Sequence, residues 1–232
     1  MQAEVVQFVK EGRYQFYREH KYVSFVLNDL ERLVAKTDFR ISSQVEKVER
    51  DFNDMVEMLR GHAEYENSKL HPLLQKKDSP IVREVENDHQ HHETQFQALQ
   101  NLLNQIKSSP DAQARIGVGY EFYLCFRKFV GDNLHHLYEE ETQILPELQK
   151  LYSDAELRTV EAETYKIMSS EELAHMLQVL FPHMNPADRE AFLIDIHLAA
   201  PEKFTQVWGE IKKNISQQEQ KQFAERLKMN TQ

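Results

Sequence analysis

Apolar residues recur along most of the chain at intervals of three and four positions, which is the period of an α-helix. The first such stretch covers residues 14–36, and the second begins at a Ser-x-x-Glu pair and runs from 43 to about 75. Two Ser-Pro pairs start further stretches, one from 79 to about 107 and one from 109 to about 150. Four long helices with short connections favour an all-α protein built on an antiparallel up-down four-helix bundle.

The pattern changes after residue 152, where helix-start signals follow one another at short intervals. In each, a Ser or Asn N-cap precedes a Pro or a Glu: Ser153 with Glu156, Ser169 with Glu172, Asn185 with Pro186, and Ser216 with Glu219. No polar low-complexity segment separates this part from the first. We predict two domains, a four-helix bundle at residues 1–150 and a module of four or five short helices at 151–232 that packs on the bundle.

One motif occurs twice, on the second and fourth predicted helices. In the first copy, Glu66 follows His62 by four residues and a proline follows that histidine by ten. The second copy has His136, Glu140 and a proline at the same spacing, 74 residues later. Four helical residues advance about 6 Å and turn about 400°, so each imidazole and its carboxylate project from one face on successive turns. Two such pairs on separate helices can hold metal ions between them.

The first and third predicted helices each offer a histidine to the same site. His20 and His89 lie on otherwise apolar helical patterns, and His92, one turn after His89, is the further candidate on the third helix, with Glu93 as the other choice. The predicted metal ligands are therefore His20, His62, Glu66, His89, His92, His136 and Glu140. Mixed imidazole and carboxylate ligands suit iron, manganese or zinc, and six or seven of them fit two ions better than one. We predict two iron ions, with manganese or zinc as alternatives.

Composition narrows the choice of partners and compartment. The chain has 28 Lys and Arg against 38 Asp and Glu, and the net charge of −10 disfavours binding to nucleic acid or to an anionic membrane. No run approaches the roughly 18 apolar residues of a membrane span, and the first residues lack the apolar core of a signal peptide. The single cysteine, Cys125, excludes an internal disulfide and a thiolate metal site. We therefore expect a cytoplasmic protein. Three other histidines, His71, His91 and His135, are expected at helix surfaces.

Together the motifs resemble the hemerythrin-like (HHE cation-binding) domain over about residues 14–150. The resemblance is carried by the first-helix histidine, the two His-x-x-x-Glu motifs, the intervening histidine and the ending Glu-Glu-Thr-Gln-Ile-Leu-Pro at 140–146. It implies a four-helix bundle around a non-haem di-iron centre with an oxo, hydroxo or carboxylate bridge. By match of motif, Glu66 and Glu140 would be the bridging carboxylates. The terminal ligands would be His20, His62, His89 and His136.

Two departures separate the chain from oxygen-carrying hemerythrins. Those proteins have a His-x-x-x-His pair on the third helix, which this chain lacks, and their last ligand is an Asp five residues after a His rather than Glu140 four after His136. The chain is more similar to the hemerythrin-like domains of iron-centre repair proteins and of iron-sensing ubiquitin ligases. Residues 176–193 also resemble the short-helix extension of the plant ligases, but no zinc-finger cysteines follow, so ligase activity is not implied.

We predict a binding rather than a catalytic role, in which the ion pair binds or senses O2, NO or iron availability, and no catalytic residue is assigned. One alternative is a redox enzyme, or an iron-donating repair protein, that counters nitrosative or oxidative damage to iron centres. Another is an interaction protein with a structural metal, whose C-terminal module contacts a protein partner. A ferritin-like site is disfavoured because its Glu-x-x-His motif occurs only at Glu86 and His89, without a second copy where symmetry requires one.

Overall fold

The computed structural model describes residues 13–227, apart from the side chains of residues 82–90. All secondary structure in this part of the chain is helical, which confirms the predicted all-α class. The chain divides into two compact units: residues 23–148 form one, and the residues on either side of that range form the other. The first unit corresponds to the predicted bundle, and the second combines the segment before it with the predicted C-terminal module.

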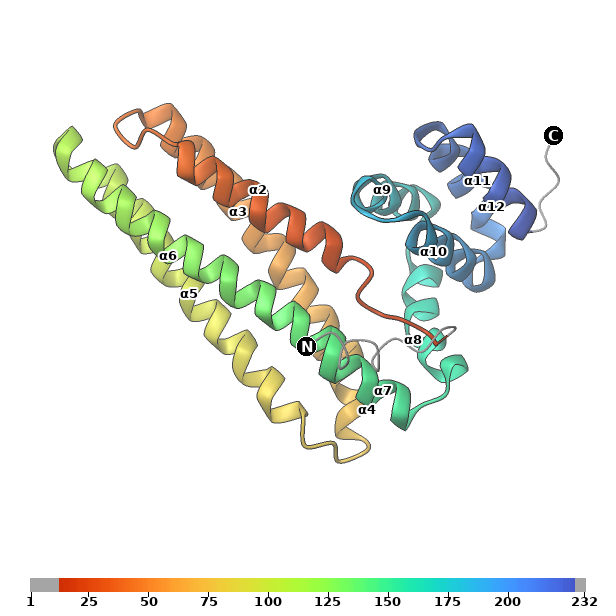
Figure 1. Ribbon diagram of the computed structural model, residues 1–232. Helices are drawn as coiled ribbons and strands as arrows, with labels where there is room; N and C mark the ends of the chain where they lie inside the picture. The colour runs from red at the N-terminus through yellow and green to blue at the C-terminus, as the bar shows by residue number, and fades with distance from the viewer. Residues whose placement is uncertain (1–12, 228–232) are drawn as a thin grey trace, which may run out of the picture. The chain divides into compact units, whose positions relative to one another are not determined.

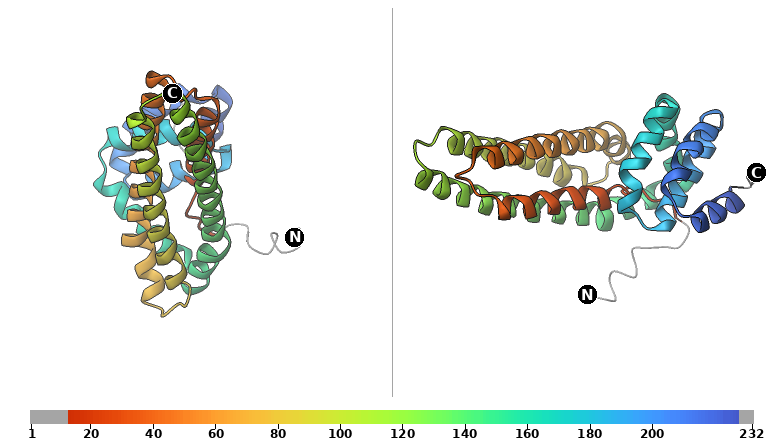
Figure 2. Two further views of the ribbon diagram at one scale, coloured as in Figure 1. Left: turned by 90° about the vertical axis from the view of Figure 1, so that its left-hand side faces the viewer. Right: turned by 90° about the horizontal axis from the view of Figure 1, so that it is seen from above.

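The bundle unit consists of four helical rods that run alongside one another in all three ribbon views (Figures 1 and 2). Four long α-helices form them, namely α2 (His20–Lys36), α3 (Ser42–Tyr65), α5 (Val82–Ser108) and α6 (Ala112–Glu139). The rods of α3 and α6 each continue through a π-helical turn into a short helix: η1 (Glu66–Leu70) and α4 (His71–Gln75), then η2 (Glu140–Ile144) and α7 (Leu145–Leu151). The predicted four-helix architecture is therefore present.

A column of aromatic rings fills the bundle core. Phe122, Phe126 and Phe129 are spaced by four and three residues, so they share one face of α6, and all three are fully buried. Their ring centroids follow one another at 5.9 and 5.8 Å. Burying each ring contributes about 2–3 kcal/mol to stability. The column ends at a polar group, because the ring of Phe129 lies 6.4 Å from that of His92.

The helix α2 begins at His20 and not at Tyr14, as the apolar pattern predicted. Tyr17 has φ = 68°, a left-handed conformation that an α-helix of L-residues does not contain. The residues before it have no regular secondary structure, and Arg13 and Tyr14 bind to α8 of their own unit. Contacts made in the folded unit therefore override a helical pattern at this point.

Three predicted N-caps are also wrong. Ile41 and Ile81, whose side chains make no capping hydrogen bond, precede α3 and α5 in place of Ser43 and Ser79. Asp111 caps α6 in place of Ser109, and its Oδ1 accepts a hydrogen bond of 2.8 Å from the N–H of Ala114. Ser109 instead ends α5, with an extended ψ of 132°. An extended residue is what a following proline favours, so the Ser-Pro pair terminates one helix rather than starting the next.

The described residues of the second unit form five short α-helices after the bundle. These are α8 (Asp154–Ile167), α9 (Ser170–Leu180), α10 (Pro186–Ala199), α11 (Pro201–Ile211) and α12 (Gln217–Arg226). All four predicted N-caps are confirmed, since each side chain accepts a hydrogen bond from the third backbone N–H of its helix: Ser153, Ser169, Asn185 and Ser216. The helices share an apolar core, against which the only tryptophan of the chain, Trp208, is packed.

A buried polar cluster joins the segment before α2 to these helices within the second unit. Glu161 of α8 accepts hydrogen bonds from the hydroxyls of Tyr14 and Tyr165, the latter at 3.0 Å. Arg18, which is 8% exposed, pairs with Asp195 of α10 at 3.0 Å. Burial raises the pKa of Glu161 from 4.5 to about 7, although the positive charge of Arg18 opposes that shift.

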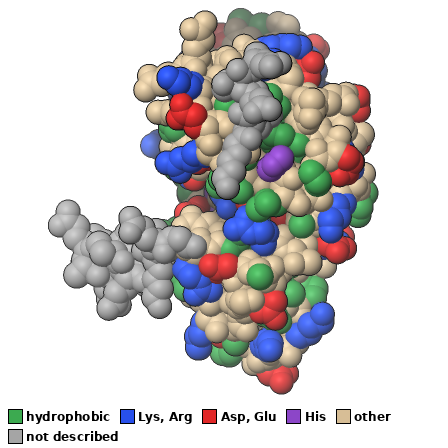
Figure 3. All heavy atoms as spheres, turned by 90° about the vertical axis from the view of Figure 1, so that its right-hand side faces the viewer, with side chains coloured by type: hydrophobic (Ala, Val, Ile, Leu, Met, Phe, Trp, Pro, Cys, Tyr) green, Lys and Arg blue, Asp and Glu red, His purple; other side chains and the backbone are tan. Residues whose placement is uncertain are grey.

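The described surface carries both signs of charge. On the face drawn in Figure 3, basic and acidic side chains are interspersed, and neither sign gathers into a continuous patch. Cys125 is exposed on α6. Among the described helices, none combines the length and the apolar character that crossing a bilayer would require.

The raised pKa of Glu161 should make the stability of this unit depend on pH. The folded unit binds the Glu161 proton more tightly than the unfolded chain does, so this stabilisation is complete below about pH 4.5 and is lost as the pH rises through about 7. Glu161→Gln cannot ionise, and should gain stability relative to wild type by up to about 3 kcal/mol between pH 5 and pH 8. Urea unfolding followed by Trp208 fluorescence measures this difference.

The matched control for that measurement is Glu163→Gln, because Glu163 is exposed on the same helix. Its stability relative to wild type should not change with pH. A stability difference between Glu161→Gln and wild type that is the same at both pH values would contradict the buried ionisation.

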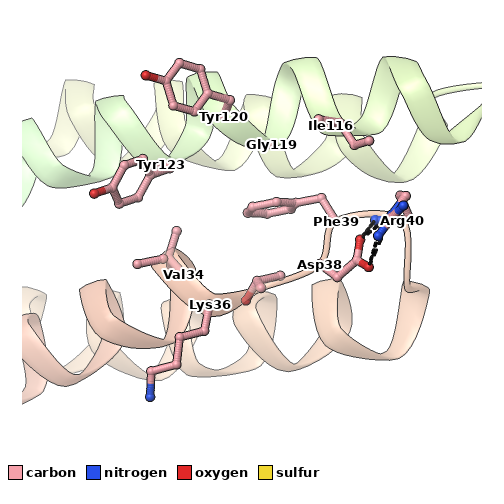
Figure 4. Close-up of a pocket in the computed structure, with 11 residues that line it drawn as sticks. Val34, Lys36, Asp38, Phe39, Arg40, Ile116, Gly119, Tyr120 and Tyr123 are labelled. Carbon is pink, nitrogen blue, oxygen red and sulfur yellow. Dashed lines mark hydrogen bonds and ion pairs between the residues drawn. The ribbon is translucent and has the colours of Figure 1, made fainter.

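Gly119 allows α6 to approach the loop that follows α2 (Figure 4). A Cβ at this position would lie 2.4 Å from the ring of Phe39, which is buried. Gly117, on the exposed side of the same helix, has nothing within 4 Å of the corresponding position. The close approach therefore requires glycine at one position and not at the other.

Alanine at these two glycines should have opposite effects. Gly119→Ala forces the ring of Phe39 to move and should destabilise the bundle by about 1–3 kcal/mol. Gly117→Ala lowers the entropy of the unfolded chain without a clash and should stabilise it by about 0.5–1 kcal/mol. Thermal unfolding followed by circular dichroism compares the two variants with wild type, and a shift of the same sign in both would contradict the close packing.

Candidate metal centre

Four side chains of types that can ligate a metal ion lie close together. His20, His62, Glu66 and Glu140 each offer one ligand atom, and these atoms all lie within 4.8 Å of one another. They come from the first residue of α2, from α3, and from the first residue of each π-helical turn. Two atoms on opposite sides of one ion are about 4 Å apart, since metal–nitrogen and metal–oxygen bonds are about 2.0–2.2 Å. The group is therefore of the size that encloses a cation.

Both carboxylates of the group are withdrawn from water. Glu66 is 0% exposed and Glu140 is 1% exposed. Each faces the histidine four residues before it: Nε2 of His62 is 3.5 Å from Oε1 of Glu66, and Nε2 of His136 is 3.0 Å from Oε1 of Glu140. Removing a carboxylate from water costs several kcal/mol unless positive charge compensates for it. Buried carboxylates beside imidazoles are ligands that iron, manganese or zinc accept, so these residues fit a bound cation.

Two further histidines, His136 beside Glu140 and His92 beside His136, extend the group. Their rings are 5.0 Å apart and nearly perpendicular, and both are buried. Glu140 thus belongs to the group of four and also contacts His136. The ring of Tyr17 lies 4.6 Å from that of His20. Among the described residues, six of the seven predicted ligands are therefore found in or beside one group.

For the other histidines, the structure agrees with the predicted position in some cases and not in others. The side chain of His89 lies outside the described residues. His91 and His135 are exposed, as predicted. The surface position predicted for His71 is wrong, because that residue is 2% exposed. When the two motif copies are aligned in sequence, His71 matches Leu145, which is apolar and also buried. The repeat therefore indicated an interior position for His71.

Each glutamate begins a π-helical turn, a feature that the sequence analysis missed. The N–H of His71 donates to the carbonyl of Glu66, and the N–H of Leu145 donates to that of Glu140, each across five residues rather than four. The next residue in both copies is a proline, which lacks an N–H and would clash with the carbonyl four residues earlier in an α-helix. The wider turn relieves this clash. The proline ten residues after each histidine was therefore the available signal, and π turns often mark functional sites.

A comparison with protein families agrees with this geometry. The family model described as "Hemerythrin HHE cation binding domain" matches residues 12–148, which is more than half of the chain. The chain belongs to this family. No match was found among curated proteins or among solved structures. The HHE family is one of cation-binding domains, and the His/Glu group lies within the matched residues.

The HHE domain has a pocket of about 330 Å³ beside the site, between α3, α5 and α6. Three of the imidazoles line it, those of His62, His92 and His136. Arg60 and Glu93 also line it and form a two-pronged ion pair, with N···O distances of 2.6 and 3.0 Å. A small molecule in this pocket would therefore meet the imidazoles directly.

Substitution of two adjacent histidines of the HHE domain should have different effects on metal binding. His136→Ala removes an imidazole that contacts a buried glutamate, and should weaken metal binding by about tenfold or more. His135→Ala removes an exposed ring one position away and should leave binding unchanged. Elemental analysis and competition with a chelator give the metal content and the affinity. Equal affinities for the two variants would contradict the assigned site.

Proposed function

We propose that the HHE domain holds two iron ions and, through them, binds or senses a small diatomic ligand, O2 or NO. The observation that supports two ions is the position of Glu140, which has His20 and His62 in its group and His136 with His92 beside it. The ions would be held by Glu66 and Glu140 together with four histidines, His20, His62, His92 and His136.

When bound, the iron pair supplies redox-active coordination positions for a small ligand. The chain's own residues decide which ligands reach it. Leu59, Phe96 and Leu137 give the pocket apolar walls, and the charges of Arg60 and Glu93 compensate each other within their ion pair. A pocket of this character can admit a small neutral molecule such as O2 or NO. The pocket also argues against a purely structural metal, which needs no access.

Sensing would operate through the stability of the bundle. The ligand atoms come from different rods, so metal that binds only the folded chain stabilises it in proportion to its affinity and concentration. Loss of iron, or a change in its oxidation state, would then change how firmly the rods hold together. A partner protein could respond to that change.

Iron content and optical spectra of the purified protein test this proposal. Protein prepared with iron should contain two iron ions per chain and show charge-transfer absorption that changes on addition of azide or NO. Glu66→Ala and Glu140→Ala should lose the iron and also the rise in melting temperature that iron causes. Glu139→Gln, at the position before Glu140, should retain both. Unchanged iron content in the two alanine variants would contradict the proposal.

The same preparations separate the alternatives. Tight, redox-silent zinc that does not respond to azide or NO would identify a structural metal. Steady reduction of NO or peroxide with an electron donor would identify an enzyme. Stoichiometric binding without turnover would support the binding and sensing role.

A further inference from the structure

Large apolar side chains gather on the outer face of α6. Of the eight that are exposed among the described residues, four belong to this helix: Ile116, Tyr120, Leu124 and Tyr138. By contrast, α3 exposes none, and neither does the part of α5 whose side chains are described. The inner face of α6 carries the aromatic column of the bundle core. A helix that is apolar on opposite faces is typical of one that is covered on both.

The exposed residues form a stripe centred on Leu124. This residue is 47% exposed and lies near the middle of the 28-residue helix. At about 100° per residue, Tyr120 and Tyr138 project within about 40° of the direction of Leu124. Gly117 and Gly131, seven residues before and after Leu124, lie within about 20° of that direction. Both glycines are exposed, so the backbone at each end of the stripe is open to a neighbouring helix.

Polar groups flank the stripe at matching positions. Glu121 and Lys128, three residues before and four after Leu124, project to one side of it, at about 60° and about 40°. Tyr120 and Arg127 project to the other side, at about 40° and about 60°. On each side, therefore, one member of a favourable pair precedes Leu124 and the other follows it.

A second copy of the chain, turned end for end about Leu124, would match these positions. A two-fold axis between two antiparallel helices leaves each side of the stripe on its own side and exchanges the positions before Leu124 with those after it. Glu121 would then meet the partner's Lys128 in an ion pair, and Tyr120 would meet the partner's Arg127 in a cation–π contact. Each contact would form twice. The stripe is self-complementary, as a symmetric contact between identical chains requires.

The two cations also have partners within the chain, but only at exposed positions. Lys128 pairs with Asp132 at 2.5 Å, and Arg127 pairs with Glu31 at 3.5 Å. Exposed pairs of this kind contribute little individually, so they are no obstacle to a further contact. Glu121 has no cationic partner among the described residues. Its charge is therefore the one that a second copy would compensate.

We propose that the outer face of α6 binds a second copy of the chain in an antiparallel, two-fold symmetric contact with Leu124 at its centre. A contact between two helices buries less area than a standard interface, so the dimer should be weak and reversible. The net charge of −10 disfavours an anionic membrane as the occupant. The contact involves the bundle unit alone and needs no bound metal.

Sedimentation velocity of the full chain, from about 1 µM to about 500 µM, tests the contact. The wild type should change from monomer to dimer across this range. Leu124→Glu buries a charge at the centre and should raise the dimer dissociation constant by about tenfold or more. Leu198→Glu makes the same change at an exposed leucine of α10 and should match wild type. A monomeric wild type, or a dimer that Leu124→Glu leaves intact, would overturn the proposal.

Charge reversal tests the antiparallel pairing itself. Glu121→Lys would place two lysines together at each of the two pairs, and Lys128→Glu would place two acids together, so each variant should dimerise about tenfold more weakly than wild type. A mixture of the two variants should form heterodimers of about wild-type affinity, because both pairs are attractive again. Isotope labelling of one variant identifies the heterodimer by native mass spectrometry. A mixture that associates no more tightly than the separate variants would overturn the proposal.

Discussion

A carboxylate that leaves water must find positive charge or hydrogen-bond donors nearby, and this bundle buries two carboxylates, Glu66 and Glu140, in its interior. Much of the bundle can be understood from that constraint. Imidazoles from neighbouring rods surround the two acids, and the aromatic column of α6 stops where they begin. A bundle without such a site would continue its apolar core, because replacing buried charges with apolar side chains is often neutral or stabilising. In this bundle, the side chains around the two carboxylates form a set of ligands suited to a cation, and a bound cation would compensate for the free energy of burying the carboxylates.

The backbone is adapted to the same constraint. Both acids stand at the first residue of a π-helical turn, and in both copies a proline follows that turn at the same distance. An undistorted α-helix would bring the proline ring against a carbonyl of the preceding turn. The wider turn avoids this contact, and in each copy it begins at a glutamate of the buried His/Glu group. Local backbone irregularity and site chemistry are thus encoded by one short motif.

The sequence was sufficient for the bundle and for much of the site, because both follow from helical periodicity. His62 with Glu66, and His136 with Glu140, are neighbours on single helices, and four-residue spacing brings each pair together without any knowledge of tertiary structure. The choice between His89 and His92 could not be made in this way, because three-residue spacing places both on one helix face. The ring distance from His92 to His136 comes only from the packing of α5 against α6.

The failures have a shared physical cause, which is that distant parts of the chain decide local structure. The helical pattern from Tyr14 onward is real, yet the segment before His20 does not form a helix, because buried partners 147 and 177 residues away bind Tyr14 and Arg18. His71 was predicted at the helix surface, although Leu145, its counterpart in the second motif copy, is apolar and indicated a buried position. Sequence periodicity reports what a helix would bury if it formed, and tertiary contacts decide whether it forms.

The two glutamates lie 74 positions apart along the chain and one in each helical hairpin of the bundle. A cation held by both would therefore fasten the first hairpin to the second, in the manner of a clip that closes a long loop. Bringing the ends of a loop of this length together costs a flexible chain conformational entropy. A metal ion that links the two ends therefore stabilises the folded state by a correspondingly large amount. Metal occupancy would then decide whether the halves of the bundle separate easily, independently of any chemistry at the ion.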